Sequence, residues 1–188
     1  VADNYIRNGM SKNTLIIGSE KYSNILDWKD RSTCVLFGDG AGAIVLSADS
    51  KEGIISSHIH ADGQYNDLLS VEGNHIKMKG NEVFKVAVNT LSKLVDETLD
   101  KNNMDKSSID WLVPHQANLR IIKAAAKKLS LPLEQVVVTV DDHANTSAAS
   151  IPLALNEAVK DGRIKEDQVL LLEAFGSGFT WGSVLLRY

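Results

Sequence analysis

The sequence has few of the residues that cross-link a protein or anchor it in a membrane. Its 188 residues contain a single cysteine, Cys34, and three prolines. One cysteine excludes an intramolecular disulfide framework and a zinc site built from several cysteines, and it agrees with a reducing compartment. No apolar run reaches the roughly 18 to 20 residues that a membrane-spanning helix needs. We therefore expect a soluble, cytoplasmic protein that does not bind a membrane.

An excess of charge of one sign is also missing. The chain has 20 Lys and Arg against 24 Asp and Glu, which gives a formal net charge of −4 at pH 7. Such a mild balance does not favour nucleic-acid binding, and any basic docking surface must be local. Hydrophobic residues make up 44% of the chain, enough for one or two domains with a packed core.

Short β-branched runs alternate with longer helical patterns. The predicted strands are 14–18, 42–47, 53–61, 109–113, 136–140, 169–174 and 182–187, and the predicted helices are 81–102, 118–129 and 146–160. From Gly53 onward this order is β-α-β-α-β-α-β-β, which favours an α/β fold with helices on the faces of a mixed sheet. Residues 1–8 resemble the middle or end of a helix, and Asn81 is the expected N-cap of the helix 81–102.

Polar and aromatic side chains follow three of the predicted strands. His115 and Gln116 come after the first of these strands, Asn145 after the second and Phe175 after the third. Because the carboxyl ends of parallel strands meet at one edge, we expect these side chains to lie together. Histidine and asparagine are neutral donors that can hold an oxygen becoming negative during a reaction. Taken singly, each has a simpler interpretation as a packing or capping residue.

Five strings of the sequence resemble a known family. VPHQANLRII, DDHANTSAASIPLAL, LLEAFGSGFTWGSVLLRY, FGDGAGAIVL and GNEVFKVAV are similar to the carboxyl-terminal part of β-ketoacyl-acyl-carrier-protein synthase III. The resemblance covers nearly the whole chain and implies a thiolase-like α/β fold. Residues 51–188 would be the carboxyl-terminal half of that fold. Residues 1–50 would be a remnant of the amino-terminal half, with a boundary near the charged stretch at 50–53.

The resemblance implies an acyltransferase that begins bacterial fatty acid synthesis. It would condense an acyl-CoA primer, typically acetyl-CoA, with malonyl-acyl carrier protein and release carbon dioxide, with no cofactor and no metal. His115 and Asn145 match two of the family's three catalytic residues, and Phe175 matches an aromatic residue of the same pocket. The implied partners are acyl carrier protein, acyl-CoA and a second copy in a homodimer, with no nucleic acid and no membrane.

Binding residues are implied in the same way. For CoA and substrate they are Arg31, Gly80, Asn81, Phe84, Asn118 and Phe175. For the carrier protein they are Gln116, Ala117, Asn118, Leu119, Arg120, Lys123, Lys127 and Lys128. Judged from spacing alone, the basic residues of this second set form either an ordinary solvated helix face or a stripe that meets an acidic partner.

The family's third catalytic residue has no match in the chain. It is a cysteine in an Ala-Cys-(Ser/Ala)-Gly-Phe type motif, and the surroundings of Cys34 lack that motif. We interpret Cys34 as a small core residue, because nothing near it in sequence would lower its pKa. We therefore expect a fragment that begins after the nucleophile and is inactive alone. The alternatives are a non-catalytic module that binds carrier protein or CoA, and a thiolase-fold paralogue with another acyl product.

Two other motifs have ordinary interpretations. The string GDGAG at 38–42 lacks the features of nucleotide-binding loops, so tight backbone packing is favoured over phosphate binding. His58 and His60 could place two imidazoles on one strand face near Asp62, yet no third histidine lies at a ligand spacing. We expect no metal site there.

Overall fold

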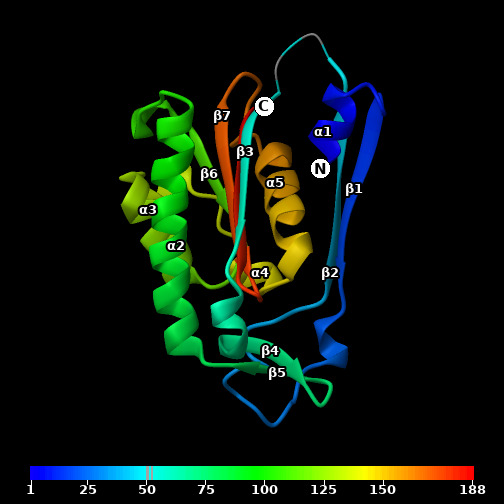
Figure 1. Cartoon of the computed structure of the whole chain (residues 1–188), viewed down its shortest axis with the longest axis vertical. Helices are drawn as coiled ribbons and strands as arrows, with labels where there is room; N and C mark the ends of the chain where they lie inside the picture. The colour runs from blue at the N-terminus through cyan, green and yellow to red at the C-terminus, as the bar shows by residue number, and fades with distance from the viewer. Residues whose placement is uncertain (50, 52) are drawn as a thin grey trace.

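A computed structural model describes residues 1–49, 51 and 53–188 of the chain. Its strands are β1 (Asn13–Glu20), β2 (Gly40–Ser47), β3 (Ile54–Ala61), β4 (Leu69–Glu72), β5 (His75–Met78), β6 (Trp111–Pro114), β7 (Val169–Gly176) and β8 (Thr180–Arg187). The central sheet has the order β3-β8-β7-β6, in which β6 and β7 are parallel and the other neighbours antiparallel. The antiparallel pair β1-β2 and the hairpin β4-β5 are separate from it (Figure 1).

Helices cover both faces of the central sheet, as the sequence predicts. The α-helices that the structure describes are α1 (Ala2–Arg7), α2 (Gly80–Lys101), α3 (Leu119–Leu129), α4 (Val140–His143) and α5 (Ser150–Lys160). Helices α2 and α3 pack on one face, and α5 lies on the other face, between the central sheet and β1-β2 (Figure 1). No helix among the described residues is both long and apolar enough to cross a membrane.

Alternation along β7 places apolar side chains on both faces of the central sheet. Leu171 packs with Leu185 in the cluster beneath α2 and α3, whereas Leu170 packs with Ala154 of α5. Burial on both faces explains why the strand is a nearly continuous apolar run. Each fully buried leucine contributes about 1.5–3 kcal/mol. A well-packed core on both faces of the sheet therefore fixes the position of the strand ends.

The strand predicted at 136–140 is wrong. Val136 forms only an isolated parallel bridge with Leu112, and the chain then turns into α4. The reason is the buried side chain of Gln116, whose amide oxygen accepts from the N–H of Thr139 at 2.8 Å and whose amide nitrogen donates to the carbonyl of Val137 at 3.0 Å. A side-chain amide thus satisfies backbone groups that a strand partner would otherwise bind.

Other predicted elements have shifted boundaries. Helix α2 begins at Gly80 with Lys79 as its N-cap residue, so the prediction that Asn81 is the N-cap is wrong. The predicted helix 146–160 begins as a 3-10 turn, η5 (Ser147–Ala149), before α5. The hairpin β4-β5 was not predicted. The predicted domain boundary includes Ser50 and Glu52, which lie outside the described residues.

Tight backbone packing at the GDGAG string is confirmed. A Cβ atom on Gly40 would lie 2.8 Å from Cγ2 of Thr146, and one on Gly42 would lie 2.7 Å from Cβ of Pro152. These distances are too short for any side chain, so β2 passes directly over the start of α5. The opposite face of β1-β2 is exposed, with Leu15, Ile17 and Val45 each at least 60% accessible.

Candidate active site

A cavity of about 720 Å³ lies where β6 and β7 end. His115, Asn145 and Phe175 all line it, as we expect for side chains that follow neighbouring strands. The first turns of α2 and α3 complete its wall with the predicted residues Gly80, Asn81, Phe84, Ala117, Asn118, Leu119 and Arg120. Segments far apart in the sequence therefore converge on one space.

His115 is fixed by contacts on several sides. Its backbone N–H donates to the carbonyl of Glu173 at 2.7 Å, which continues the pairing of β6 with β7. Its ring Nδ1 lies 2.6 Å from Oγ of Ser150, and the ring meets Phe175 edge-on with centroids 6.2 Å apart. Burial lowers the pKa of His115 to about 4, so the imidazole is neutral at pH 7.

Asn145 is held at the other side of the cavity. Its backbone N–H donates to Leu36 at 2.9 Å, and its carbonyl accepts from the N–H of Gly38 at 3.0 Å. Its side-chain oxygen Oδ1 accepts from the N–H of Ser147 at 3.0 Å. The residue is only 8% exposed. With Oδ1 occupied by an internal donor, the amide nitrogen Nδ2 is the group left to meet a ligand.

The free nitrogens of these two side chains give the cavity its chemistry. Nε2 of His115 and Nδ2 of Asn145 have no hydrogen bond to a described residue. Neither nitrogen is fully buried. Both are therefore accessible to a molecule in the cavity. With a proton on Nε2, these two nitrogens would be neutral donors beside the apolar ring of Phe175, a combination that suits an oxygen that gains negative charge.

The rim of the cavity combines capping and aromatic contacts. Asn118 caps α3, because its side-chain oxygen accepts from the N–H of Ile121 at 3.0 Å. The guanidinium of Arg120 lies over the ring of Phe84. Leu119 is 42% exposed, whereas Ala117 is buried. The predicted binding residues on these two helix starts thus surround the entrance.

Several predicted binding residues do not lie where the resemblance implies. Gln116 is fully buried and its amide bonds only to backbone groups, so its predicted contact with a carrier protein is wrong. Arg31 is exposed but does not line the cavity. Lys128 pairs with Asp96 of α2 at 2.6 Å, whereas Lys123 and Lys127 are exposed on α3. Lys128 is partly exposed, and its role in the basic stripe stays a prediction.

Two neighbours of His115 were not singled out from the sequence. Ser150 is 2% exposed and bonds to its ring. Glu173 is 1% exposed, neither carboxyl oxygen has a partner among the described residues, and burial raises its pKa to about 8. The signal for Glu173 is a single carboxylate inside an apolar strand; no comparable signal marks Ser150.

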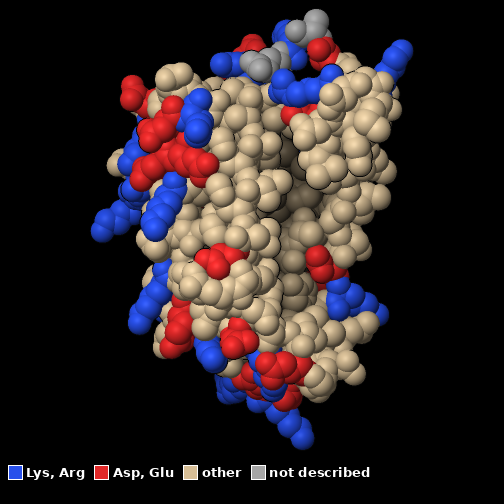
Figure 2. All heavy atoms as spheres, in the orientation of Figure 1, with Lys and Arg blue, Asp and Glu red and all other residues tan. Residues whose placement is uncertain are grey.

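A second cavity lies on the α5 side of the sheet, the side opposite to the side chain of Glu173. This cavity of about 520 Å³ is lined by residues of β3, β8 and the start of α5, and by His115 and Phe175. It lies in the hollow visible between the central sheet and β1-β2 (Figure 2). His115 therefore borders two cavities, one at the ends of β6 and β7 and one on the α5 side of the sheet.

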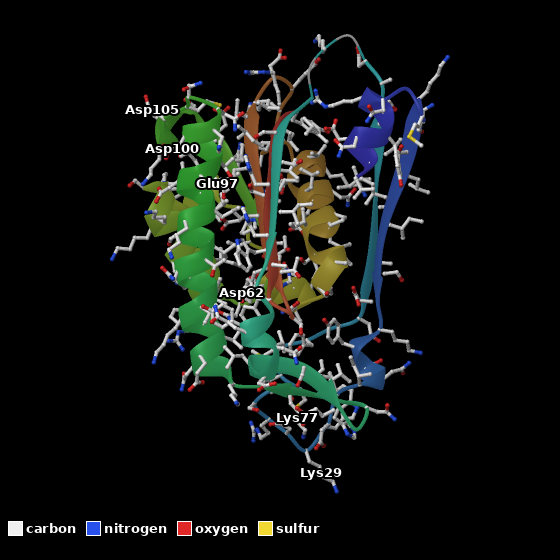
Figure 3. All side chains as sticks on the ribbon, viewed as in Figure 1. Lys29, Asp62, Lys77, Glu97, Asp100 and Asp105 are labelled. Carbon is white, nitrogen blue, oxygen red and sulfur yellow. The ribbon has the colours of Figure 1, made fainter. Side chains whose placement is uncertain are left out.

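The histidines of β3 are explained by an acidic neighbour. Glu97 of α2 points toward β3 (Figure 3), where one carboxylate oxygen lies 2.8 Å from Nε2 of His60 and the other 3.7 Å from Nδ1 of His58. Among the residues that the structure describes, no group of three or more His, Cys, Asp or Glu side chains could hold a metal ion. Asp62 instead caps a 3-10 turn.

Cys34 lies apart from the cavity. It is half-buried rather than a core residue, which corrects the sequence interpretation, and its sulfur lies 3.9 Å from the carbonyl of Trp28. It does not line the space that holds His115 and Asn145.

Comparison with known proteins gives a consistent family. The model of the 3-oxoacyl-[acyl-carrier-protein (ACP)] synthase III family matches residues 1–63, and the model of its C-terminal domain matches residues 99–188. The chain is 60% identical to the β-ketoacyl-[acyl-carrier-protein] synthase III of Methylococcus capsulatus and equally identical to that of Aliivibrio fischeri. In both cases the alignment covers the whole chain and 62% of the relative.

Solved structures agree with the sequence matches. The 3-oxoacyl-[acyl-carrier-protein] synthase III of Aquifex aeolicus superposes with a TM-score of 0.97 at 48% identity, covering the whole chain and 61% of that protein. The Thermus thermophilus enzyme gives 0.95 at 42% identity, covering the whole chain and 62% of that protein. The predicted thiolase-like fold is confirmed, and the chain spans about three fifths of the length of these relatives. The chain belongs to the 3-oxoacyl-[acyl-carrier-protein] synthase III family.

Proposed function

We propose that this chain carries the condensation site of a β-ketoacyl-acyl-carrier-protein synthase III. In that reaction malonyl-acyl carrier protein loses carbon dioxide and joins an acyl group, typically acetyl from acetyl-CoA. One observation carries the proposal: a neutral imidazole and a carboxamide, His115 and Asn145, each turn a nitrogen without a described partner toward the same cavity. The names of the relatives agree with this activity.

The geometry suits the step that creates negative charge. When the bond between the malonyl α-carbon and its carboxylate breaks, carbon dioxide leaves and the electron pair forms an enolate on the thioester. The N–H groups of His115 and Asn145 would hold the enolate oxygen, and removing one such donor typically costs about 2.7–4 kcal/mol of transition-state stabilisation. With its pKa lowered to about 4, His115 has no imidazolium proton at pH 7 to quench the carbanion.

Carbon–carbon bond formation needs an acylated nucleophile. In our proposal the enolate carbon attacks a thioester carbonyl on a cysteine, the thiolate leaves, and a β-ketoacyl thioester remains on the carrier protein. Cys34 does not line the cavity. We therefore propose that this cysteine belongs to the part of the relatives that the 188 residues do not span, and that these residues alone do not condense.

Carrier protein and CoA would approach over the rim. Gly80, Asn81, Phe84 and Asn118 border the entrance and would contact the pantetheine arm. On α3, Arg120, Lys123 and Lys127 are exposed and would meet the acidic surface of acyl carrier protein. The enzyme would act as a homodimer in the cytoplasm and would need no metal or cofactor.

A chimera tests this function directly. The chain is joined to the preceding segment of the Methylococcus capsulatus relative and given acetyl-CoA and malonyl-acyl carrier protein, with products followed by mass spectrometry. We expect acetoacetyl-carrier protein from the chimera and none from the 188-residue chain. Binding of carrier protein by the chimera without turnover would favour a non-catalytic module, and preference for another acyl group would favour a paralogue.

A further inference from the structure

Ser150 occupies a special place beside the candidate active site. It is the first residue of α5 and is 2% exposed. Its Oγ lies 2.6 Å from Nδ1 of His115 and accepts a longer hydrogen bond, 3.4 Å, from the backbone N–H of Gln116. Helix α5 therefore contacts the imidazole from the side opposite to the accessible nitrogen Nε2.

The donors and acceptors around Ser150 determine the direction of its short hydrogen bond with His115. A serine hydroxyl has one hydrogen to donate, and the Ser150 oxygen already accepts from Gln116. Among the described residues, Nδ1 of His115 is the hydrogen-bonding partner that can act as its acceptor. A buried hydroxyl without an acceptor is unfavourable. The hydroxyl therefore donates to Nδ1, which must carry the lone pair.

A neutral imidazole has one N–H, so a lone pair on Nδ1 places the proton on Nε2. We infer that Ser150 is a positioning residue that holds His115 in the tautomer protonated at Nε2. The inference rests on the proposed function for its purpose, because only this tautomer offers a donor to an oxyanion in the cavity. The edge-on contact with Phe175, at an angle of 71°, adds a second restraint on the ring.

The reverse arrangement has clear disadvantages. If Nδ1–H donated to Ser150, the serine hydrogen would have no acceptor among the described residues. Nε2 would then present a lone pair to the cavity, and that lone pair would repel an enolate oxygen. The direction of this hydrogen bond, together with the nitrogen that carries the imidazole proton, thus decides whether Nε2 donates to an oxyanion or repels it.

Nitrogen NMR on the 188-residue chain reads the tautomer without any reaction. With 15N-labelled histidine, two-bond correlations distinguish a protonated Nε2 from a protonated Nδ1, and a His115→Gln variant assigns the signals. We expect one neutral tautomer, with its proton on Nε2, in the native chain at pH 7. A proton on Nδ1 would overturn the inference.

Substitution then tests whether Ser150 is the cause. Ser150→Ala is expected to give a mixture of both tautomers, and Ser150→Thr, which keeps the hydroxyl, is expected to restore the single form. Ser183→Ala is the matched control, because it removes another buried hydroxyl, bonded to Thr98 rather than to His115. An unchanged tautomer in a folded Ser150→Ala variant, or an equal change in Ser183→Ala, would contradict the role of Ser150.

Activity distinguishes this inference from the proposed function. In an active chimera, Ser150→Ala should lower kcat about tenfold with little change in KM, less than the roughly 10²–10³-fold loss on removing an oxyanion donor. If the tautomer depends on Ser150 but the chimera does not condense, the positioning role stands and the proposed function fails. If the chimera condenses and Ser150→Ala leaves both kcat and the tautomer unchanged, the proposed function stands and the positioning role of Ser150 fails.

Discussion

The guanidinium carbon of Arg120 lies 4.7 Å from the centroid of the Phe84 ring, and this contact joins the first turn of α3 to the first turn of α2. Both residues border the cavity that holds His115 and Asn145. A cation over an exposed aromatic face is stabilised by about 0.5–1 kcal/mol. The same arginine thus shapes the entrance and adds positive charge to it.

Replacing Arg120 separates these two contributions. Arg120→Lys keeps the charge but loses the flat stacking surface, so we expect KM for malonyl-acyl carrier protein to rise about threefold in the chimera. Arg120→Ala also removes the charge, and its KM should rise further while its dependence on salt becomes weaker. Steady-state kinetics at several salt concentrations provide the measurement. Lys165→Ala, at an exposed lysine that does not line the cavity, is the control; a similar change there would argue against a specific surface.

The two cavity donors should matter for one half of the reaction. In the chimera, His115→Ala and Asn145→Ala are each expected to lower malonyl decarboxylation about 10²–10³-fold, because the enolate loses one preorganised donor. Transfer of the acetyl group from CoA to the cysteine forms no enolate and should change far less. The two half-reactions are measured separately, by carbon dioxide release and by mass of the acyl-enzyme. Equal losses in both would indicate that these residues only support the fold.

Glu173 predicts a particular dependence of stability on pH. Burial raises its folded-state pKa to about 8, above its ordinary value, so the folded chain holds the proton more tightly than the unfolded chain. This contribution to stability is fully present below about pH 4.5 and is lost as pH rises to about 8. Glu173→Gln removes the titration, so its stability relative to the native chain should increase from pH 5 to pH 8, by up to about 4 kcal/mol. Urea unfolding at a series of pH values measures this difference, and a pH-independent difference would refute the prediction.

Gln116 should be important for stability rather than for docking. Gln116→Leu removes three hydrogen bonds, to Pro114, Val137 and Thr139, and leaves buried backbone groups without partners. We expect the free energy of unfolding to fall by about 2 to 4 kcal/mol. Gln64→Leu, at an exposed glutamine, should change it by no more than about 0.5 kcal/mol. Matching values from urea unfolding of the two variants would show that the buried amide is dispensable.

Much of the fold and part of the candidate site could be predicted because the signals are local. The apolar run of β7 and the 3–4 spacing of α2 each indicate one element. His115, Asn145 and Phe175 follow strands, and strands of one sheet end together, so their convergence in one cavity follows from their order along the chain.

The remainder depends on pairs that are distant in sequence. The segment at 136–140 has the composition of a strand, but the amide of Gln116 turns it away after one bridge. Ser150 has an ordinary place at the start of a helix, and only the folded chain brings its hydroxyl to a ring 35 residues earlier. Neither contact, that of Gln116 with residues 137 and 139 or that of Ser150 with His115, produces a periodic pattern in the sequence.

The glycines of the β1-β2 pair also limit how these strands can align. Gly18 and Gly42 are directly opposite each other in the pair, and both approach the backbone or ring atoms of residues 148–152. Sliding β1 by one residue would bring Ile17 or Ser19 into the place of Gly18, where no side chain fits. Direct contact with the segment that follows Asn145 therefore restricts the register of the two strands. A misaligned pair would displace Asn145 from the cavity. We therefore expect a folding error in this small sheet to disturb the candidate active site before it changes the secondary structure.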